Sequence, residues 1–181
     1  MDGKKIIIGV TGGVAIYKTC TLIRLLRKAG AEMQVIMTKN AEKLVSAALF
    51  RSVSQSMVHT PMFDATNDGG VKHINLSQWA DFMIIAPATA NTIGKVANGI
   101  ADNLLTTTIM AMSPQKPIFI APAMNVNMWN NIAVQNNIKN LSDFGWHIIL
   151  PESGTLADGS IGAGRMAEPA KIIQEINLIV K

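Results

Sequence analysis

The chain has 181 residues, 49% of them hydrophobic, and this length favours one well-buried domain over two. The net charge of +4 comes from scattered basic residues without interleaved aromatics, so no nucleic-acid partner is expected. A single cysteine excludes an intramolecular disulfide, and the first residues lack the apolar core of a signal peptide, so we expect a cytoplasmic protein. No apolar run approaches the ~20 residues that cross a bilayer, so no membrane partner is expected.

The chain begins with a pattern typical of a strand, a glycine loop and a helix. Residues 4–10 predict the strand and residues 15–29 the helix, and between them lie Gly12, Gly13 and Val14. The spacing matches neither the dinucleotide fingerprint nor a P-loop. Glycines at the start of a helix still let a phosphate approach the backbone closely, so this turn is a candidate binding site, with a plain tight turn as the alternative.

A second strand is predicted over residues 32–38, with Thr38 at its carboxyl end. In a parallel sheet Thr38 lies at the same edge as the glycine loop, which makes its hydroxyl a candidate for the same ligand. Asn40 is expected to cap a helix over residues 41–50, and residues 51–70 are expected to form a long connection.

The most informative stretch is residues 81–103. Residues 82–86 form a short unbroken apolar run, typical of a central parallel strand, and the next proline is expected to end it. Small residues, hydroxyls and one amide follow, and a helix opening at Thr92 would direct its dipole and free N–H groups toward an anion. An ordinary helix cap fits the composition equally well. The candidate ligand-binding residues of this loop are Pro87, Ala88, Thr89, Ala90 and Asn91.

Polar residues also follow the next elements. Asp102 and Asn103 are expected to cap a helix, and Thr106 is one of three hydroxyl residues near its first turns, some of which can reach the ligand. Residues 117–121 predict another strand, and Asn125 follows closely at its carboxyl end. Asn125 is therefore the expected amide that binds the substrate.

The remaining elements complete an α/β fold. Residues 131–144 and 169–180 predict helices, and residues 146–150 predict a last strand. The expected architecture is a Rossmann-like, doubly wound parallel sheet of five strands with helices on both faces, in one domain. Residues 150–168 contain four glycines and few core-forming side chains, so we expect a mobile surface segment that acts as a lid.

Four motifs extend along nearly the whole chain: KHI at 72–74, PATANT at 87–92, PAMNVNMW at 122–129 and GAGRMAEP at 162–169. Together they resemble the flavin-dependent cysteine decarboxylases, which include phosphopantothenoylcysteine decarboxylase and the lantibiotic peptidyl-cysteine decarboxylases. The resemblance covers almost all of the sequence, with the motifs in the order of the family.

The resemblance implies that the cofactor is FMN, bound between protomers of a homotrimer or an assembly of trimers. It implies that His73 is the active-site base and that residues 150–168 clamp the substrate, either a phosphorylated cysteine conjugate or a cysteine-ended peptide. No two histidines show metal-ligand spacing, so no metal is expected. The predicted substrate-binding residues are Asn125, Met128, Gly164, Arg165 and Met166.

One position departs from the family pattern. In the coenzyme A branch a cysteine of an LACG motif protonates the ene-thiolate, whereas here the motif reads LADG and places Asp158 at that position. Asp158 acts as the proton donor if burial under the lid raises its pKa. Alternatively the reaction stops at the ene-thiol, or the chain is a non-catalytic flavin-binding subunit. The GAGRMAEP ending favours the coenzyme A branch, so 4'-phosphopantothenoylcysteine is the expected substrate.

Overall fold

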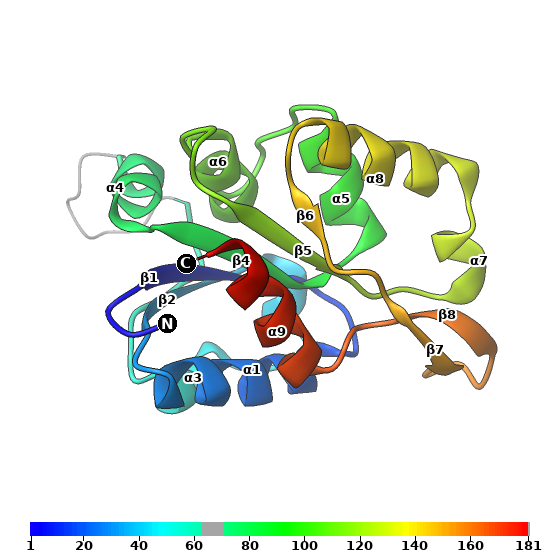
Figure 1. Cartoon of the computed structure of the whole chain (residues 1–181), viewed down its shortest axis with the longest axis horizontal. Helices are drawn as coiled ribbons and strands as arrows, with labels where there is room; N and C mark the ends of the chain where they lie inside the picture. The colour runs from blue at the N-terminus through cyan, green and yellow to red at the C-terminus, as the bar shows by residue number, and fades with distance from the viewer. Residues whose placement is uncertain (63–70, 181) are drawn as a thin grey trace.

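A parallel sheet of six strands forms the centre of the molecule (Figure 1). The computed structural model describes residues 1–62 and 71–180. The six strands are β1 Lys5–Val10, β2 Glu32–Met37, β3 Val58–His59, β4 Phe82–Ala88, β5 Ile118–Pro122 and β6 His147–Ile148. Their order, β3-β2-β1-β4-β5-β6, is the doubly wound order, which reverses direction between β1 and β4. The predicted Rossmann-like α/β fold is confirmed, with six strands in this sheet in place of five.

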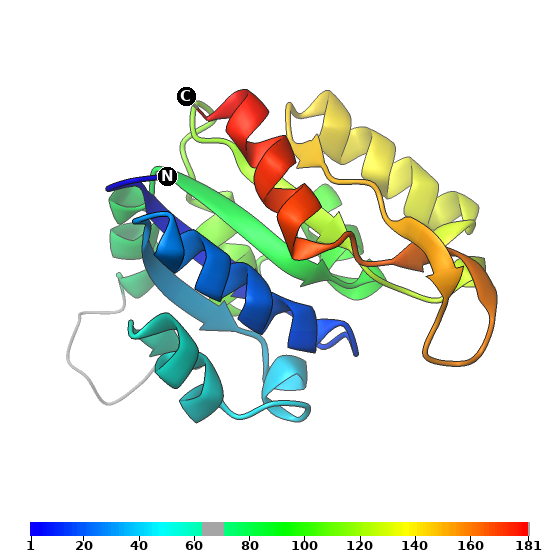
Figure 2. The same ribbon diagram turned by 60° about the horizontal axis from the view of Figure 1, so that its bottom comes forward.

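Helices cover both faces of the sheet because alternate strand residues point to opposite sides. Ile6, Ile8 and Val10 pack with the helices on one face, whereas Ile7 and Ile85 pack with those on the other. Figures 1 and 2 show α9 beside α1 on the first face. The helices are α1 Ile16–Lys28, α2 Lys39–Glu42, α3 Ala47–Ser54, α4 Lys72–Trp79, α5 Ala90–Ala97, α6 Leu104–Met110, α7 Val126–Trp129, α8 Ile132–Asp143 and α9 Pro169–Ile179.

The structure corrects the expected end of the central strand. β4 continues through Pro87 to Ala88, and its pairing with β5 becomes irregular between Ile85 and Ala88. The missing N–H of proline is tolerated where the ladder is irregular. Helix α5 starts at Ala90, earlier than predicted, because the Thr89 hydroxyl caps it by accepting the N–H of Thr92.

Three other predicted boundaries were wrong. Thr38, in place of Asn40, caps α2, and the helix predicted over 41–50 is divided between α2 and α3. The connection predicted over 51–70 contains β3, although residues 63–70 lie outside the described residues. Helix α4 begins at Lys72 and includes His73.

The segment over 150–168, expected to be a mobile lid, contains an antiparallel hairpin whose register shifts between Glu152 and Ser153. Its strands are β7 Glu152–Thr155 and β8 Ile161–Arg165. Met166 and Ala167, which follow the hairpin, are fully buried against the core, so the segment is anchored at this end.

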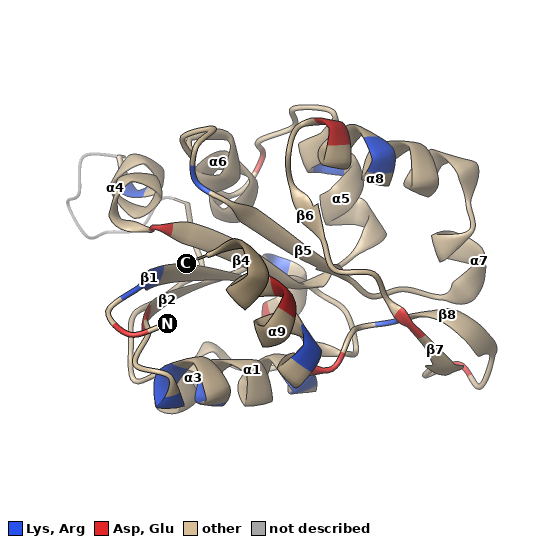
Figure 3. Cartoon of the chain, viewed as in Figure 1, with Lys and Arg blue, Asp and Glu red and all other residues tan. Residues whose placement is uncertain are grey.

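Positive charge is not concentrated on one element of the described structure. Lysines and arginines are spread over α1, α3, α5, α8 and α9, with acidic residues among them (Figure 3). None of the helices in the described ranges has the combined length and apolarity that a membrane crossing requires.

Candidate functional site

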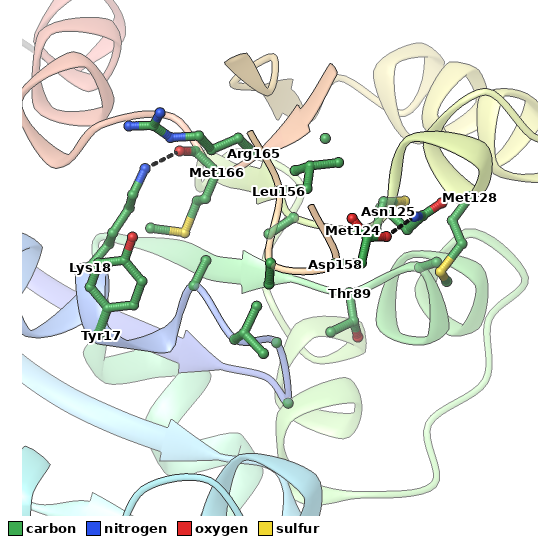
Figure 4. Close-up of a pocket in the computed structure, with 18 of the residues that line it drawn as sticks. Tyr17, Lys18, Thr89, Met124, Asn125, Met128, Leu156, Asp158, Arg165 and Met166 are labelled. Atoms are coloured by element: carbon green, nitrogen blue, oxygen red, sulfur yellow. Dashed lines mark hydrogen bonds between the residues drawn. The ribbon is translucent and has the colours of Figure 1, made fainter. Parts of the chain in front are cut away.

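A cavity of about 820 Å³ lies at the carboxyl ends of β1, β4 and β5 (Figure 4). Its walls are the loops that follow these three strands, the start of α1 and the β7–β8 hairpin. The volume falls within the roughly 300–1,000 Å³ range of small-molecule sites. The position, where the strand order reverses, is the usual binding crevice of open α/β sheets.

Most of the predicted site residues line this cavity. The glycine turn and the PATANT loop meet across it, and the residues predicted to bind substrate come from two places: the segment after β5 with α7, and the end of the hairpin. The predicted residues in the lining are Gly12, Gly13, Val14, Thr89, Ala90, Asn91, Asn125, Met128, Asp158, Gly164, Arg165 and Met166.

Four predicted cofactor-binding residues lie outside the lining, where they cap helices or are buried in the central strand. The Thr38 hydroxyl accepts the N–H of Ala41 at 3.3 Å and caps α2. Pro87 and Ala88 are buried in β4, and Thr106 is buried in the capping box of α6. Their assignment to cofactor binding stays a prediction.

His73 lies in the first turn of α4, and α4 contributes no residue to the cavity lining. Its side chain is half-buried. The role of His73 as the active-site base stays a prediction, and within one chain the described residues do not bring it to the cavity.

A buried hydroxyl joins the two loops that form the floor of the cavity. Thr11, only 1% exposed, donates to the carbonyl of Pro87 at 2.6 Å and accepts the N–H of Thr89 at 3.1 Å. The glycine turn packs on the same loop, since a Cβ built on Gly13 would lie 3.4 Å from Pro87. Thr11 was missed by the sequence analysis, although a hydroxyl directly after a buried strand is a recognisable signal.

The N-terminus of α1 presents a favourable place for an anion. No side chain caps this 13-residue helix, and no acidic residue lies in its first turn. The positive end of its dipole therefore faces the cavity without a side-chain cap or an acidic residue of its own first turn.

A cationic cluster lies at the side of the cavity where the hairpin joins α9. The Lys18 ammonium is 5% exposed and donates to the carbonyl of Met166 at 2.7 Å and to Oε1 of Glu168 at 2.8 Å. The Arg165 guanidinium donates to the same carboxylate oxygen at 2.7 Å. Hydrogen bonds from Lys18 and then Arg165 hold the pKa of Glu168 below its ordinary value.

Lys18 and Glu168 were not predicted. The available signal was the place of Lys18 four residues before Leu22, on the buried stripe of α1, where a lysine requires a partner. Figure 4 shows the Lys18 side chain extending toward Met166.

The tip of the hairpin contacts Asn125. One oxygen of Asp158 accepts from the Asn125 amide, and the other accepts the N–H and hydroxyl of Ser160 at 3.0 and 2.6 Å. These hydrogen bonds, with those of Ser160 first, lower the pKa of Asp158. The hypothesis of a buried Asp158 with a raised pKa is therefore wrong for this conformation, in which the side chain is exposed.

Comparisons with known proteins identify what this geometry resembles. A family model described as Flavoprotein matches residues 1–181. The chain is 45% identical over 174 residues to the coenzyme A biosynthesis bifunctional protein CoaBC of Bacillus subtilis (strain 168), covering 96% of this chain and 42% of the relative. It therefore spans less than half the length of the curated relatives it matches.

Solved structures agree in fold over nearly the full chain. A cysteine-to-serine mutant of PPC decarboxylase, complexed with pantothenoylaminoethenethiol, superposes with a TM-score of 0.86 at 34% identity and 97% coverage of both chains. The FMN-dependent cysteine decarboxylase SpaF gives a TM-score of 0.79 at 34% identity, covering 96% of this chain and 97% of that one.

Proposed function

The chain belongs to the flavoprotein family, and on that premise we propose that it binds FMN and decarboxylates a cysteinyl carboxylate, specifically that of 4'-phosphopantothenoylcysteine. The family relationship supports the flavin-dependent cysteine decarboxylase class. The choice of substrate rests on the relatives of coenzyme A biosynthesis and on the GAGRMAEP motif.

The observation that carries the proposal is the cavity between the glycine turn and the PATANT loop. Its residues fit FMN: the uncapped start of α1 suits a phosphate, and small residues, Gly12, Gly13 and Ala90, line the cavity beside it. The link through Thr11 holds the two loops in one arrangement before any ligand arrives.

A cysteinyl carboxylate does not lose CO₂ readily, because the resulting carbanion has no group to delocalise it. Flavin, when bound, accepts the hydride equivalent that converts the cysteine thiol to a thioaldehyde, the electron sink for decarboxylation. The protein orients the substrate and controls protons. Asn125 donates an amide N–H to the carboxylate, and Met128 and Met166 provide an apolar wall.

We assign the base to His73 of a neighbouring copy in a homotrimer or an assembly of trimers. In the described part of one chain, no histidine lines the cavity. Beside it, Val14 and Tyr17 are each 66% exposed, which favours coverage by another protomer. Light scattering that finds a monomer with FMN fully bound rules this assembly out.

A second candidate is a flavin-binding subunit without turnover. The specific observation in its favour is Asp158, an ionised and exposed carboxylate at the position of the family's catalytic cysteine. A third outcome is release of the ene-thiol without its reduction.

One experiment separates these candidates. The purified protein, saturated with FMN, is mixed with phosphopantothenoylcysteine, and CO₂ release, flavin absorbance and product mass are recorded. CO₂ release with a bleached flavin and a product two hydrogens lighter than phosphopantetheine indicates the ene-thiol. CO₂ release with oxidised flavin and phosphopantetheine indicates the complete reaction. Flavin binding without CO₂ favours the subunit, and His73→Asn is the inactive control for either reaction.

A further inference from the structure

The amide of Asn125 has a fixed orientation. Asn125 is the N-cap of α7, and its Oδ1 accepts the N–H of Asn127 at 2.7 Å. Because the oxygen is committed to this cap, the Nδ2 group must face away from the helix. Figure 4 shows it directed toward Asp158 at the cavity, where it donates to that carboxylate.

The hairpin holds Asp158 in place to receive this hydrogen bond. The turn at its tip is closed by hydrogen bonds from the N–H of Leu156 to Ser160 O at 2.8 Å and from the N–H of Gly159 to Leu156 O at 3.0 Å. Ser160 binds the second carboxylate oxygen through its N–H and hydroxyl. Both oxygens of Asp158 are therefore occupied within the chain.

The base of the hairpin is fixed to the same segment that carries Asn125. The N–H of Met124 donates to the carbonyl of Gly164 at 2.9 Å. A Cβ on Gly164 would lie 2.2 Å from the Met124 carbonyl oxygen, and one on Gly162 would lie 2.6 Å from Val126. The strand thus packs tightly on residues 124–126, and only the tip is left to move away from Asn125.

We propose that Asp158 is an internal occupant of the carboxylate subsite, so that the hairpin tip competes with the substrate for the Asn125 amide. The identity of the ligand as a cysteinyl carboxylate rests on the proposed function. The two carboxylates have the same charge and the same donor, so they cannot occupy the subsite together without repulsion. Substrate binding requires the tip to release Asn125.

This competition determines which ligands gain from the subsite. In the wild type, a ligand carboxylate only replaces the Asp158 carboxylate as acceptor of the Asn125 N–H. A ligand amide is a weaker acceptor, so its hydrogen bond to Asn125 contributes less to affinity. Removing the Asp158 carboxylate therefore increases the affinity for the carboxylate ligand more than the affinity for the amide. We expect about a threefold to tenfold gain, the range of one ordinary hydrogen bond, because exposure of Asp158 to solvent weakens a charge-assisted bond.

The test uses two thiol-free probes, phosphopantothenoyl-alanine and its C-terminal amide, titrated by calorimetry into FMN-saturated protein. Asp158→Ala is expected to bind the carboxylate probe threefold to tenfold more tightly than the wild type, with a smaller gain for the amide probe. Asp158→Asn keeps a neutral acceptor, so its affinity for the carboxylate probe is expected to lie between those of the wild type and Asp158→Ala. Asp143→Ala removes the same charge from α8, outside the cavity, and leaves both affinities unchanged.

Equal or weaker binding of the carboxylate probe by both Asp158 variants overturns the inference, as does an equal gain for both probes, which indicates a cavity that is merely more open. Failure of the inference and of the proposed function are distinguishable. CO₂ release by the wild type without the expected gain rejects only the self-competition. If neither the wild type nor any variant releases CO₂ or binds a probe, the proposed cysteinyl carboxylate substrate is rejected. The competition by Asp158 is then rejected with it.

Discussion

Glu168→Gln tests whether the buried Lys18 ammonium depends on an ionised partner. Lys18 is 5% exposed, and its Nζ reaches Oε1 of Glu168 at 2.8 Å, whereas the Glu168 side chain is 47% exposed. Removing one partner of a fully buried pair costs about 3–5 kcal/mol. Here water reaches the carboxylate and glutamine keeps an acceptor oxygen, so we expect a loss of about 1–2 kcal/mol in the free energy of unfolding at pH 7.

The loss depends on pH in a direction that the structure determines. The pKa of Glu168 in the folded chain is below its ordinary value because Lys18, and then Arg165, donate to the carboxylate. The stabilisation that ionised Glu168 provides is therefore fully present above the ordinary carboxyl pKa. It disappears as the pH falls through the lower pKa that Glu168 has in the folded chain. The difference between the wild type and Glu168→Gln should narrow below about pH 4.

Urea denaturation at pH 7 and at several lower pH values measures both effects, at one protein concentration and with FMN saturated throughout. In thermal unfolding at pH 7, the melting temperature of Glu168→Gln should be about 2–8 °C lower than that of the wild type for a domain of this size. Glu175→Gln makes the same charge change at an exposed position of α9 and is the matched control. A loss that is constant with pH, or no larger than that of the control, refutes the role given to the ion pair.

Two further substitutions address the cavity walls. Thr11→Val removes the hydroxyl that joins the two floor loops, and it should weaken FMN retention on dialysis and lower stability by about 1–2 kcal/mol. Thr19→Val, which loses a buried bond to the carbonyl of Ala86 outside the cavity, should lower stability alone. Gly164→Ala forces a methyl group against the Met124 carbonyl, so trypsin should cleave the hairpin faster than in Gly159→Ala, where φ is also positive but nothing lies within 4 Å. Equal cleavage of the two variants contradicts the packing argument.

The sequence was sufficient for the central elements because their signals are local. The unbroken apolar run before Pro87 is typical of a covered strand, and the parallel order then placed the loops after β1, β4 and β5 at one edge. Most predicted residues line one cavity for this reason. The two-residue strands β3 and β6 carry too few side chains to establish a period, so they were missed or overextended.

Contacts between distant segments explain the other differences. Lys18 and Glu168 are separated by 150 positions, and neither local sequence indicates that the two side chains form an ion pair. Asp158 has the composition of a turn residue, and its contact with Asn125 depends on the hairpin folding back over the cavity. The glycines of 150–168 favoured a mobile surface segment, yet Gly162 and Gly164 permit strand β8 to pack against residues 124–126.

In the part of the chain that the structure describes, β7 and β8 pair as strands only with each other and add no strand to the six-stranded sheet. Insertions or replacements within residues 156–160 therefore leave the strand pairing of the main sheet in place, while they alter the groups that line one wall of the cavity. Divergence within such a family can proceed by exchanging this short tip on a constant scaffold, and grafting the tip of one relative onto another is a direct route to altered substrate preference.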